Sequence, residues 1–339
     1  SEKYRLSFTV QAISRGGSLE IEVIGELSEE MRRLIPDVSI SRVKSYIGDE
    51  FWNFEIKSGA VYGSGASLNA NIAFHKAVSE FVERDALNSF GKILNVKTSS
   101  GFAAHLNTEL AQRASRSELI ERDVLLVSWF GDIRPCWVPR ESFQSFEKFA
   151  RYFDYFDSVG IGIKVGLLGS SSGDFVSVGM VDFDVFSDGS ASWAVTTESD
   201  RDLQRALEKA LISLFRIVNL ILTRDSSQKA LFNEVQVSDI KKPADHLDFH
   251  LDPRNRRMLS DWWNSKSSSV AQFGQSPINS TEVESSLARN LGRSVSFSFS
   301  PVLISYFVGV SVDEDGVSRR LSELGLKRKR SFYDVHPLS

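Results

Sequence analysis

The alternation of apolar and polar positions changes along the chain, and the changes predict its helices and strands. Residues 19–25 and 51–57 alternate with a period of two, which predicts strands in a β-rich start over residues 1–60. Helical spacing follows over residues 68–90, and a second helix is predicted over residues 107–124. The other predicted elements are a helix beginning at Ser199 and strands at residues 161–168, 174–184, 191–197 and 301–311.

The remaining segments complete the expected organisation. The apolar run at residues 124–130 fits either a buried strand or more helix. Residues 224–290 are polar with little periodicity and are interpreted as a long, partly mobile insertion, and residues 327–339 as a C-terminal tail. Because strands and helices are mixed, the predicted fold class is α/β (α+β), with residues 1–339 forming a single large domain.

Composition narrows the functional class. The chain has 339 residues, of which 42% are hydrophobic and 25% charged, as in ordinary globular proteins. Its net charge of −4 disfavours nucleic acid or an anionic membrane as the main partner. The single cysteine rules out an internal disulfide and a cysteine-rich zinc site. Since the N-terminus lacks a signal-peptide pattern, a cytoplasmic location is expected.

A short internal repeat contains most of the candidate chemistry. Residues 79–87 read SEFVERDAL and residues 117–125 read SELIERDVL, with six of nine positions identical. Both copies fall in predicted helices and carry two glutamates three residues apart, which project side by side. The repeat therefore predicts two similar helices within one fold, each with a pair of neighbouring carboxylates.

A helical wheel turns several of these charges toward the expected core. In the first helix Arg84 falls inside the apolar arc, Glu80 lies just off its edge, and Glu83 lies roughly opposite. In the second helix both Glu118 and Glu121 fall inside the arc. Charges at core-facing positions are costly unless they are paired or bound to a cation.

Two interpretations of the repeat remain open. Two glutamate pairs that face each other form an acidic pocket, and Mg²⁺ prefers a few carboxylates together with substrate phosphates and water. This interpretation predicts a Mg²⁺–nucleotide site between two helices. The E-x-x-E-R pattern is also common on solvated helices, where a glutamate and the arginine four residues later form an ordinary surface pair.

The repeat and its surroundings resemble a known family. The stretch GSGASLNANIAFHKAVSEFVERDAL (63–87), followed by ELIERD (118–123), resembles the YcaO family, whose members carry such paired glutamate helices. WAVTTESDRDLQRALEKALISLF (193–215) resembles the third helix segment of the family, and HPLS (336–339) resembles its proline-rich carboxyl end. The resemblance implies a YcaO-like fold with mixed sheets and a nucleotide site between the glutamate-bearing helices.

The resemblance also implies a reaction, which is ATP- and Mg²⁺-dependent activation of a peptide backbone amide. A nucleophile adds to the amide carbon, the amide oxygen takes the γ-phosphoryl group of ATP, and phosphate then leaves. A Cys, Ser or Thr side chain as nucleophile leaves an azoline ring, sulfide leaves a thioamide, and an amine leaves an amidine. Azoline formation in a ribosomally made precursor peptide is the first prediction, and a thioamide-forming enzyme with a partner protein is the alternative.

The resemblance assigns roles to residues of this chain by position. The expected ligands of Mg²⁺ and phosphate are Glu80, Glu83, Glu118 and Glu121. The expected cofactor-binding residues are Ser64 in the glycine loop, Lys76, Glu80, Arg84 and Arg122. His336 and Ser339 in the tail are expected to assist proton transfer at the activated amide.

Several positions depart from the pattern usual in the family. Lys76 stands where the first helix usually has a serine. Ser213 and Arg216 stand where the third helix usually has a glutamate and a glutamine. The departures leave open a non-catalytic scaffold subunit with a decayed nucleotide site, and a generic Mg²⁺-dependent phosphotransferase is a further alternative.

The expected partners follow from the predicted reaction. They are the precursor peptide, a leader-binding partner subunit and, for azole formation, a flavin oxidase; a homo-oligomer stays open. Residues 1–60 look like the start of the main fold, not an added peptide-binding module, so the chain alone is expected to be a poor enzyme. Outside the repeat, the aspartates and histidines of residues 245–252 offer a metal site if extended, but a solvated loop is the favoured interpretation.

Overall fold

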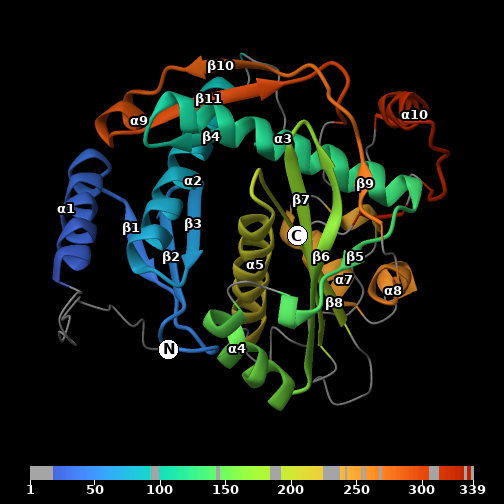
Figure 1. Cartoon of the computed structure of the whole chain (residues 1–339). Helices are drawn as coiled ribbons and strands as arrows, with labels where there is room; N and C mark the ends of the chain where they lie inside the picture. Colours follow the sequence, from blue (N-terminus) through green and yellow to red (C-terminus); the bar gives the residue numbers. More distant parts are fainter. Residues whose placement is uncertain are drawn as a thin grey trace.

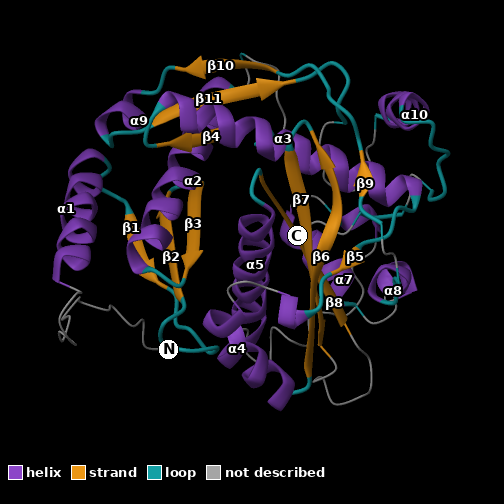
Figure 2. Cartoon of the chain, viewed as in Figure 1, coloured by secondary structure: helices purple, strands orange, loops and turns teal. Residues whose placement is uncertain are grey.

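The computed structural model describes residues 18–91, 93, 99–142, 146–183, 192–223, 237–240, 243–252, 255, 257–266, 269–304, 313–331 and 334–336. In this part of the chain the strands form three sheets (Figure 1, Figure 2). The first is antiparallel, with β1 (Ser39–Arg42), β2 (Trp52–Ser58) and β3 (Val61–Ser67) in that order. The second is also antiparallel, in the order β10 (Asn279–Val283), β11 (Ser294–Phe299) and β4 (Phe102–His105).

The third sheet is the largest. Its antiparallel strands are β5 (Cys136–Trp137), β6 (Ile161–Ser171), β7 (Asp174–Phe183) and β8 (Ser192–Asp200), and β9 (Ala271–Gln272) pairs with β6 in parallel. The helices are α1 (Ser18–Leu34), α2 (Ala70–Phe90), α3 (Thr108–Gly131), α4 (Phe146–Ser158), α5 (Leu203–Thr223), α7 (Pro243–Leu251), α8 (Arg257–Trp263), α9 (Ser286–Asn290) and α10 (Glu314–Glu323). Short 3₁₀ turns lie at Arg140–Ser142 and Val237–Asp239. The mixed fold predicted from the sequence is confirmed.

Helix α2 forms where the sequence predicted a helix, and it packs closely on the first sheet. Its buried stripe includes Phe74, Val78 and Phe81, and the side chain of Asn69 caps its first turn by accepting a hydrogen bond from the Ile72 amide. A Cβ placed on Gly65 of β3 would lie 2.2 Å from a carbonyl oxygen of α2. Glycine therefore lets β3 approach the helix that carries the first glutamate pair.

Helix α3 connects two sheets. It is longer than predicted and absorbs residues 124–130, which are helical and not a strand. It contacts β4 and β11 of the second sheet and β6, β7 and β8 of the third, and Figure 1 shows it crossing the molecule between them. Its length of 24 residues leaves the second glutamate pair in the middle of this crossing.

The third sheet buries both faces. Val181 and Phe183 of β7 pack in the cluster that includes α4 and α5, whereas Val178 and Met180 of the same strand face the cluster around α3 and α8. Alternate residues of a strand point to opposite faces, so one strand serves both clusters. The sheet thus holds α5 and α3 on opposite sides, with β8 between them.

The predicted strand at residues 19–25 is wrong, because these residues belong to α1. Only the first residues of that segment alternate; from Ile24 onward the apolar positions follow helical spacing through Leu27, Met31 and Leu34, and these side chains pack against the core around α2. The β-rich start therefore begins only at β1.

The predicted polar insertion at residues 224–290 also needs correction. Residues 224–236 lie outside the described residues, but α7 and α8 follow, and Leu247, Leu251, Leu259 and Trp262 are buried. Helices of nine and seven residues are too short to show a clear apolar period in the sequence.

Two further boundaries differ from the prediction. Helix α5 begins at Leu203 and not at Ser199, since Ser199 is still part of β8 and the Asp202 side chain accepts a hydrogen bond from the Arg205 amide. Residues 301–304 are not a strand, and residues 305–311 of that predicted strand lie outside the described residues. No described helix combines the length and the apolar character that a membrane crossing requires.

Candidate nucleotide site

Glu80 of α2 is held by the first sheet and by its own helix. One carboxylate oxygen accepts hydrogen bonds from the Ser64 amide at 2.7 Å and the Ser64 hydroxyl at 3.0 Å, and the other accepts one from Arg84 at 2.7 Å. The Glu80–Arg84 pair expected of a solvated helix is therefore present. However, the hydrogen bonds from Ser64 also fix the Glu80 carboxylate beside β3, the strand that contains Gly63 and Gly65.

Glu83 differs from its neighbours in having no direct partner. In the part of the chain that the structure describes, its carboxylate makes no hydrogen bond and no ion pair. Burial, followed by the nearby carboxylates of Glu118 and Glu80, raises the pKa of Glu83 well above its ordinary value. An unpaired carboxylate surrounded by others is a ready ligand for a divalent cation.

The second glutamate pair faces the first from α3. Arg122 lies 3.6 Å from Glu118 and 3.2 Å from Glu121, and the Thr197 hydroxyl donates to Glu121 at 2.8 Å. Burial raises the pKa of Glu118 to about 7 and that of Glu121 to about 8. The two pairs thus share one acidic cluster, as the inward-facing wheel of α3 predicted.

A fifth acidic residue, Glu198 of β8, was missed in the sequence. It lies close enough to raise the pKa of Glu121 further, and it accepts a hydrogen bond from Ser213 of α5. The resemblance led us to expect a glutamate at the position of Ser213 on α5. Instead, Ser213 contacts a glutamate that β8 supplies. The signal available in the sequence was the polar run Thr196–Ser199 at the end of an apolar strand.

Cations from α2 and α5 border the same cluster. Lys76 donates to the Ala66 carbonyl at 3.4 Å, and Arg216 donates to the Ser64 hydroxyl at 3.0 Å. Burial, with Lys209 and Arg216 nearby, lowers the pKa of Lys76, while Glu198 opposes the shift. The predicted cofactor-binding residues Ser64, Lys76, Glu80, Arg84 and Arg122 therefore border one region of the protein.

The donor set fits a Mg²⁺–nucleotide complex better than an all-protein metal cage. Among the described residues, no three His, Cys, Asp or Glu side chains are arranged to hold a metal ion by themselves. Mg²⁺ commonly uses one or two carboxylates and completes its coordination with phosphate oxygens and water. Glu83, which has no partner among the described residues, is the carboxylate best suited to this role.

The predicted tail residues lie elsewhere or outside the described residues. His336 is fully buried, its ring lies 4.5 Å from that of His246, and its carbonyl oxygen is 3.0 Å from His250 Nε2. The preceding residues reach the end of α3, where the Trp129 indole donates to the Asp334 carbonyl. These contacts fix the position of His336. Ser339 lies outside the described residues.

The aspartate and histidine run at residues 245–252 is not a solvated loop. Most of it belongs to α7, which places His246 and His250 one turn apart and buries both. Burial lowers the pKa of both histidines, and that of His250 falls to about 3. Both imidazoles lie within hydrogen-bond distance of the His336 carbonyl oxygen, so the run anchors the C-terminal segment.

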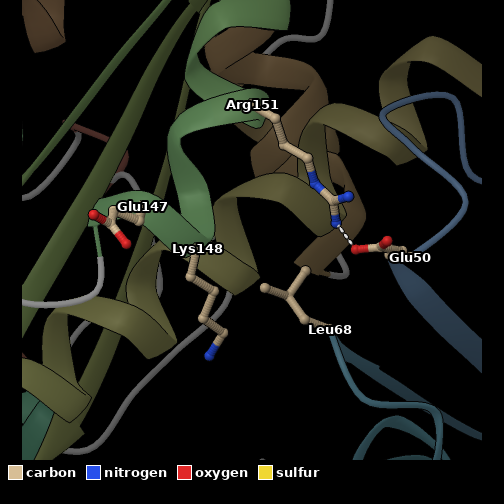
Figure 3. Close-up of a pocket in the computed structure, with 5 residues that line it drawn as sticks. All are labelled: Glu50, Leu68, Glu147, Lys148 and Arg151. Carbon is tan, nitrogen blue, oxygen red and sulfur yellow. Dashed lines mark hydrogen bonds and ion pairs between the residues drawn. The ribbon is translucent and has the colours of Figure 1, made fainter.

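A cavity of about 350 Å³ lies apart from the glutamate cluster (Figure 3). It is lined by Glu50, Leu68, Glu147, Lys148 and Arg151, none of which is a predicted site residue. Its charges are largely paired, because Arg151 bonds Glu50, as Figure 3 shows, and Lys148 lies 3.5 Å from Glu208. The cavity therefore lacks the group of converging carboxylates that the glutamate cluster provides.

A profile of the YcaO cyclodehydratase family, described as ATP- and Mg²⁺-binding, matches residues 89–293. The chain therefore belongs to the YcaO family, and the prediction of ATP and Mg²⁺ as cofactors is confirmed at the level of the family. The matched range includes Glu118 and Glu121 but begins after Glu83. No curated protein matches the chain by sequence.

Solved structures share the fold at low sequence identity. A heterocyclase in complex with substrate and cofactor is 12% identical, with a TM-score of 0.65, over 93% of this chain and 56% of the heterocyclase. YcaO from Methanopyrus kandleri bound with AMPPCP and Mg²⁺ is 12% identical, with a TM-score of 0.59, over 84% of this chain and 91% of that one. The chain thus spans little more than half of the heterocyclase.

A third similar structure belongs to a multi-subunit complex. It is the E. coli microcin synthetase McbBCD complex with pro-MccB17 bound, which is 10% identical with a TM-score of 0.59. The match covers 88% of this chain and 96% of that one. These likenesses confirm the predicted YcaO-like fold.

Proposed function

We propose that the chain catalyses ATP- and Mg²⁺-dependent activation of backbone amides in a ribosomally made precursor peptide, forming azolines from Cys, Ser or Thr. The observation that supports this most is the cluster of glutamates from α2 and α3, in which Glu83 has no partner among the described residues. Family membership supports the same cofactors. The heterocyclase and microcin synthetase structures favour a peptide substrate.

The proposed roles of the residues follow from their contacts. Glu83 and Glu121 would hold Mg²⁺ together with phosphate oxygens, and Glu80 and Glu118 would complete the acidic shell through metal-bound water. Arg84 and Arg122 orient carboxylates, as their present ion pairs with Glu80 and Glu118 already do. Ser64 keeps Glu80 in place through its amide and hydroxyl.

The chemistry required of the bound nucleotide is transfer of its γ-phosphoryl group to the amide oxygen, with Mg²⁺ neutralising the phosphate charge. The nucleophilic side chain forms a bond to the amide carbon, and the amide oxygen leaves as phosphate. The products are the azoline, ADP and inorganic phosphate.

The tail residues keep their proposed part in proton transfer. The described contacts of His336 are buried, so we propose that its cluster with His246 and His250 fixes the direction of the last residues. The terminal carboxylate of Ser339 would then act at the activated amide. Deleting residues 336–339 should abolish peptide modification while leaving ATP binding largely intact; normal modification by the truncated chain contradicts this role.

The proposed partners are a leader-binding subunit, which would raise the local peptide concentration, and a flavin oxidase for azoles. Assembly into a homo-oligomer is a further proposal, which the mass of the protein in solution would test. Thioamide formation is the alternative chemistry. A scaffold subunit is the second candidate, and it is favoured by one observation, the contact of Arg216 with Ser64 where a nucleotide is proposed to bind.

ATP binding and turnover test the proposal. Calorimetry with Mg²⁺-ATP, followed by phosphate release with and without candidate peptide and partner, should show binding and peptide-stimulated hydrolysis. Glu83→Gln and Glu121→Gln should reduce turnover by on the order of 100-fold or more, since each removes a charge close to the transferred group. Glu109→Gln, at an exposed position of the same helix as Glu121, is the matched control. Full activity in both site variants overturns the site, and the absence of ATP binding favours the scaffold.

A further inference from the structure

Two cations beside the glutamate cluster are anchored on neighbouring positions of one strand. Arg216 of α5 donates to the Ser64 hydroxyl, and Lys76 of α2 donates to the Ala66 carbonyl. Ser64 and Ala66 are two residues apart on β3, a spacing of about 7 Å in a strand. The two charged groups therefore approach the same stretch of β3 from different helices.

Among the described residues, neither cation is in direct contact with a carboxylate. Neither Lys76 nor Arg216 forms an ion pair there, although Glu198 lies close enough to oppose the lowered pKa of Lys76. The other arginines of the site are paired, since Arg84 contacts Glu80 and Arg122 contacts Glu118 and Glu121. Two adjacent positive charges without a direct counterion repel each other and attract an anion.

Carboxylates and cations lie close together in this site. Glu83, Glu118 and Glu121 lie near one another, whereas Lys76 and Arg216 lie near each other and near Glu198. A chain of phosphate groups with a divalent cation bound to it matches this arrangement. Its metal-bearing phosphates suit the glutamates, and its remaining oxygens suit the two cations.

We propose that Lys76 and Arg216 bind phosphate oxygens of the nucleoside triphosphate directly, so that part of the nucleotide affinity does not depend on Mg²⁺. This inference rests on the proposed function of the same site. Arg216 has a planar group suited to two phosphate oxygens, and Lys76 is a compact charge. These two positive charges would take over part of the phosphate neutralisation otherwise provided by Mg²⁺.

Calorimetry of ATP binding in excess EDTA and in Mg²⁺ tests the inference. The wild-type chain should bind ATP in EDTA, and inorganic tripolyphosphate should compete for the site. Lys76→Gln and Arg216→Gln should each weaken binding in EDTA by about 10-fold or more, because a hydrogen bond to a charged group contributes that much. The loss should be smaller in Mg²⁺. Arg33→Gln, on exposed α1, removes one charge elsewhere and should change neither affinity.

Each other outcome is decisive. Binding of ATP by the wild type in Mg²⁺ but not in EDTA, with Arg216→Gln unchanged, overturns the direct contacts and leaves the proposed function standing. Tighter binding in Arg216→Gln shows that Arg216 obstructs the site and also overturns the inference. No ATP binding in either condition removes the proposed function together with the inference. Unchanged melting temperatures of both variants confirm that they fold.

Discussion

Replacing Glu121 with glutamine is expected to stabilise the nucleotide-free protein at neutral pH while removing its activity. Burial raises the pKa of this carboxyl from 4.5 to about 8, against the opposing influence of Arg122. Since the folded-state pKa lies above the unfolded value, the folded state binds the proton more tightly. The free energy of unfolding is therefore highest below about pH 4.5 and falls as the pH rises to about 8.

The magnitude follows from the shift. At about 1.4 kcal/mol per pKa unit, Glu121 costs on the order of 3 kcal/mol at pH 7 relative to an ordinary carboxyl. Glutamine keeps the shape and can still accept the hydrogen bond from Thr197, but it carries no titrating charge. Because Glu83 and Glu118 titrate in the same cluster, we expect a measured gain of about 1–3 kcal/mol at pH 7 and almost none at pH 4.5.

Urea unfolding at pH 4.5, 6, 7 and 8, without divalent cations or nucleotide, measures this difference. Glu109→Gln is the control, because Glu109 is exposed in the first turn of the same helix and its replacement should change stability by about 0.5 kcal/mol or less. A Glu121→Gln protein that is less stable than the wild type by the same amount at every pH refutes the reasoning. It would mean that Arg122 stabilises Glu121 as an ion in the absence of any bound cation.

Two further predictions concern buried charges outside the glutamate cluster. Asp123→Asn should lower the free energy of unfolding by about 3–5 kcal/mol, because it removes the buried counterion of Arg320, now 2.9 Å away, and leaves only the more exposed Glu323 at 3.7 Å. Urea unfolding checks this, and a loss below about 1 kcal/mol contradicts it. His250→Leu should flatten the acid limb of the stability profile. Burial lowers the pKa of His250 to about 3. The contribution of the neutral histidine to the free energy of unfolding is therefore complete above about pH 6.5, and about 2 kcal/mol of it is lost by pH 5. Wild-type and variant free energies of unfolding that change in parallel between pH 7 and pH 5 count against this prediction.

The helices of the site were predictable because the spacing of their apolar residues follows the helical period clearly. Residues 68–90 and 107–124 have long apolar stripes, and α2 and α3 form there. The segment at 19–25 failed because its first residues alternate and the helical stripe becomes visible only from Ile24. The short helices α7 and α8 offer too few positions for any period to emerge.

The site itself was predictable only in part. The inward direction of Glu118 and Glu121 was predictable because their helix faces were inferred from the same stripe that builds the core. Glu198 was missed because its approach to Glu121 depends on the packing of β8 against α3, which local patterns do not encode. The burial of His336 likewise depends on α7, whose histidines looked solvated in the sequence. Residues brought together by tertiary packing need the fold before they can be recognised.

The pairing of β4 with β11 makes the acidic cluster a late product of folding. His105 pairs with Ser294, so the second sheet cannot close until residue 294 has left the ribosome. Helix α3 packs on that sheet, and we expect its two glutamates to reach their final positions only after the sheet has formed. Contacts between such distant segments slow folding because long loops must close first. A nascent chain should therefore hold the two glutamate pairs apart until β11 has been synthesised, and the proposed nucleotide site should form only then.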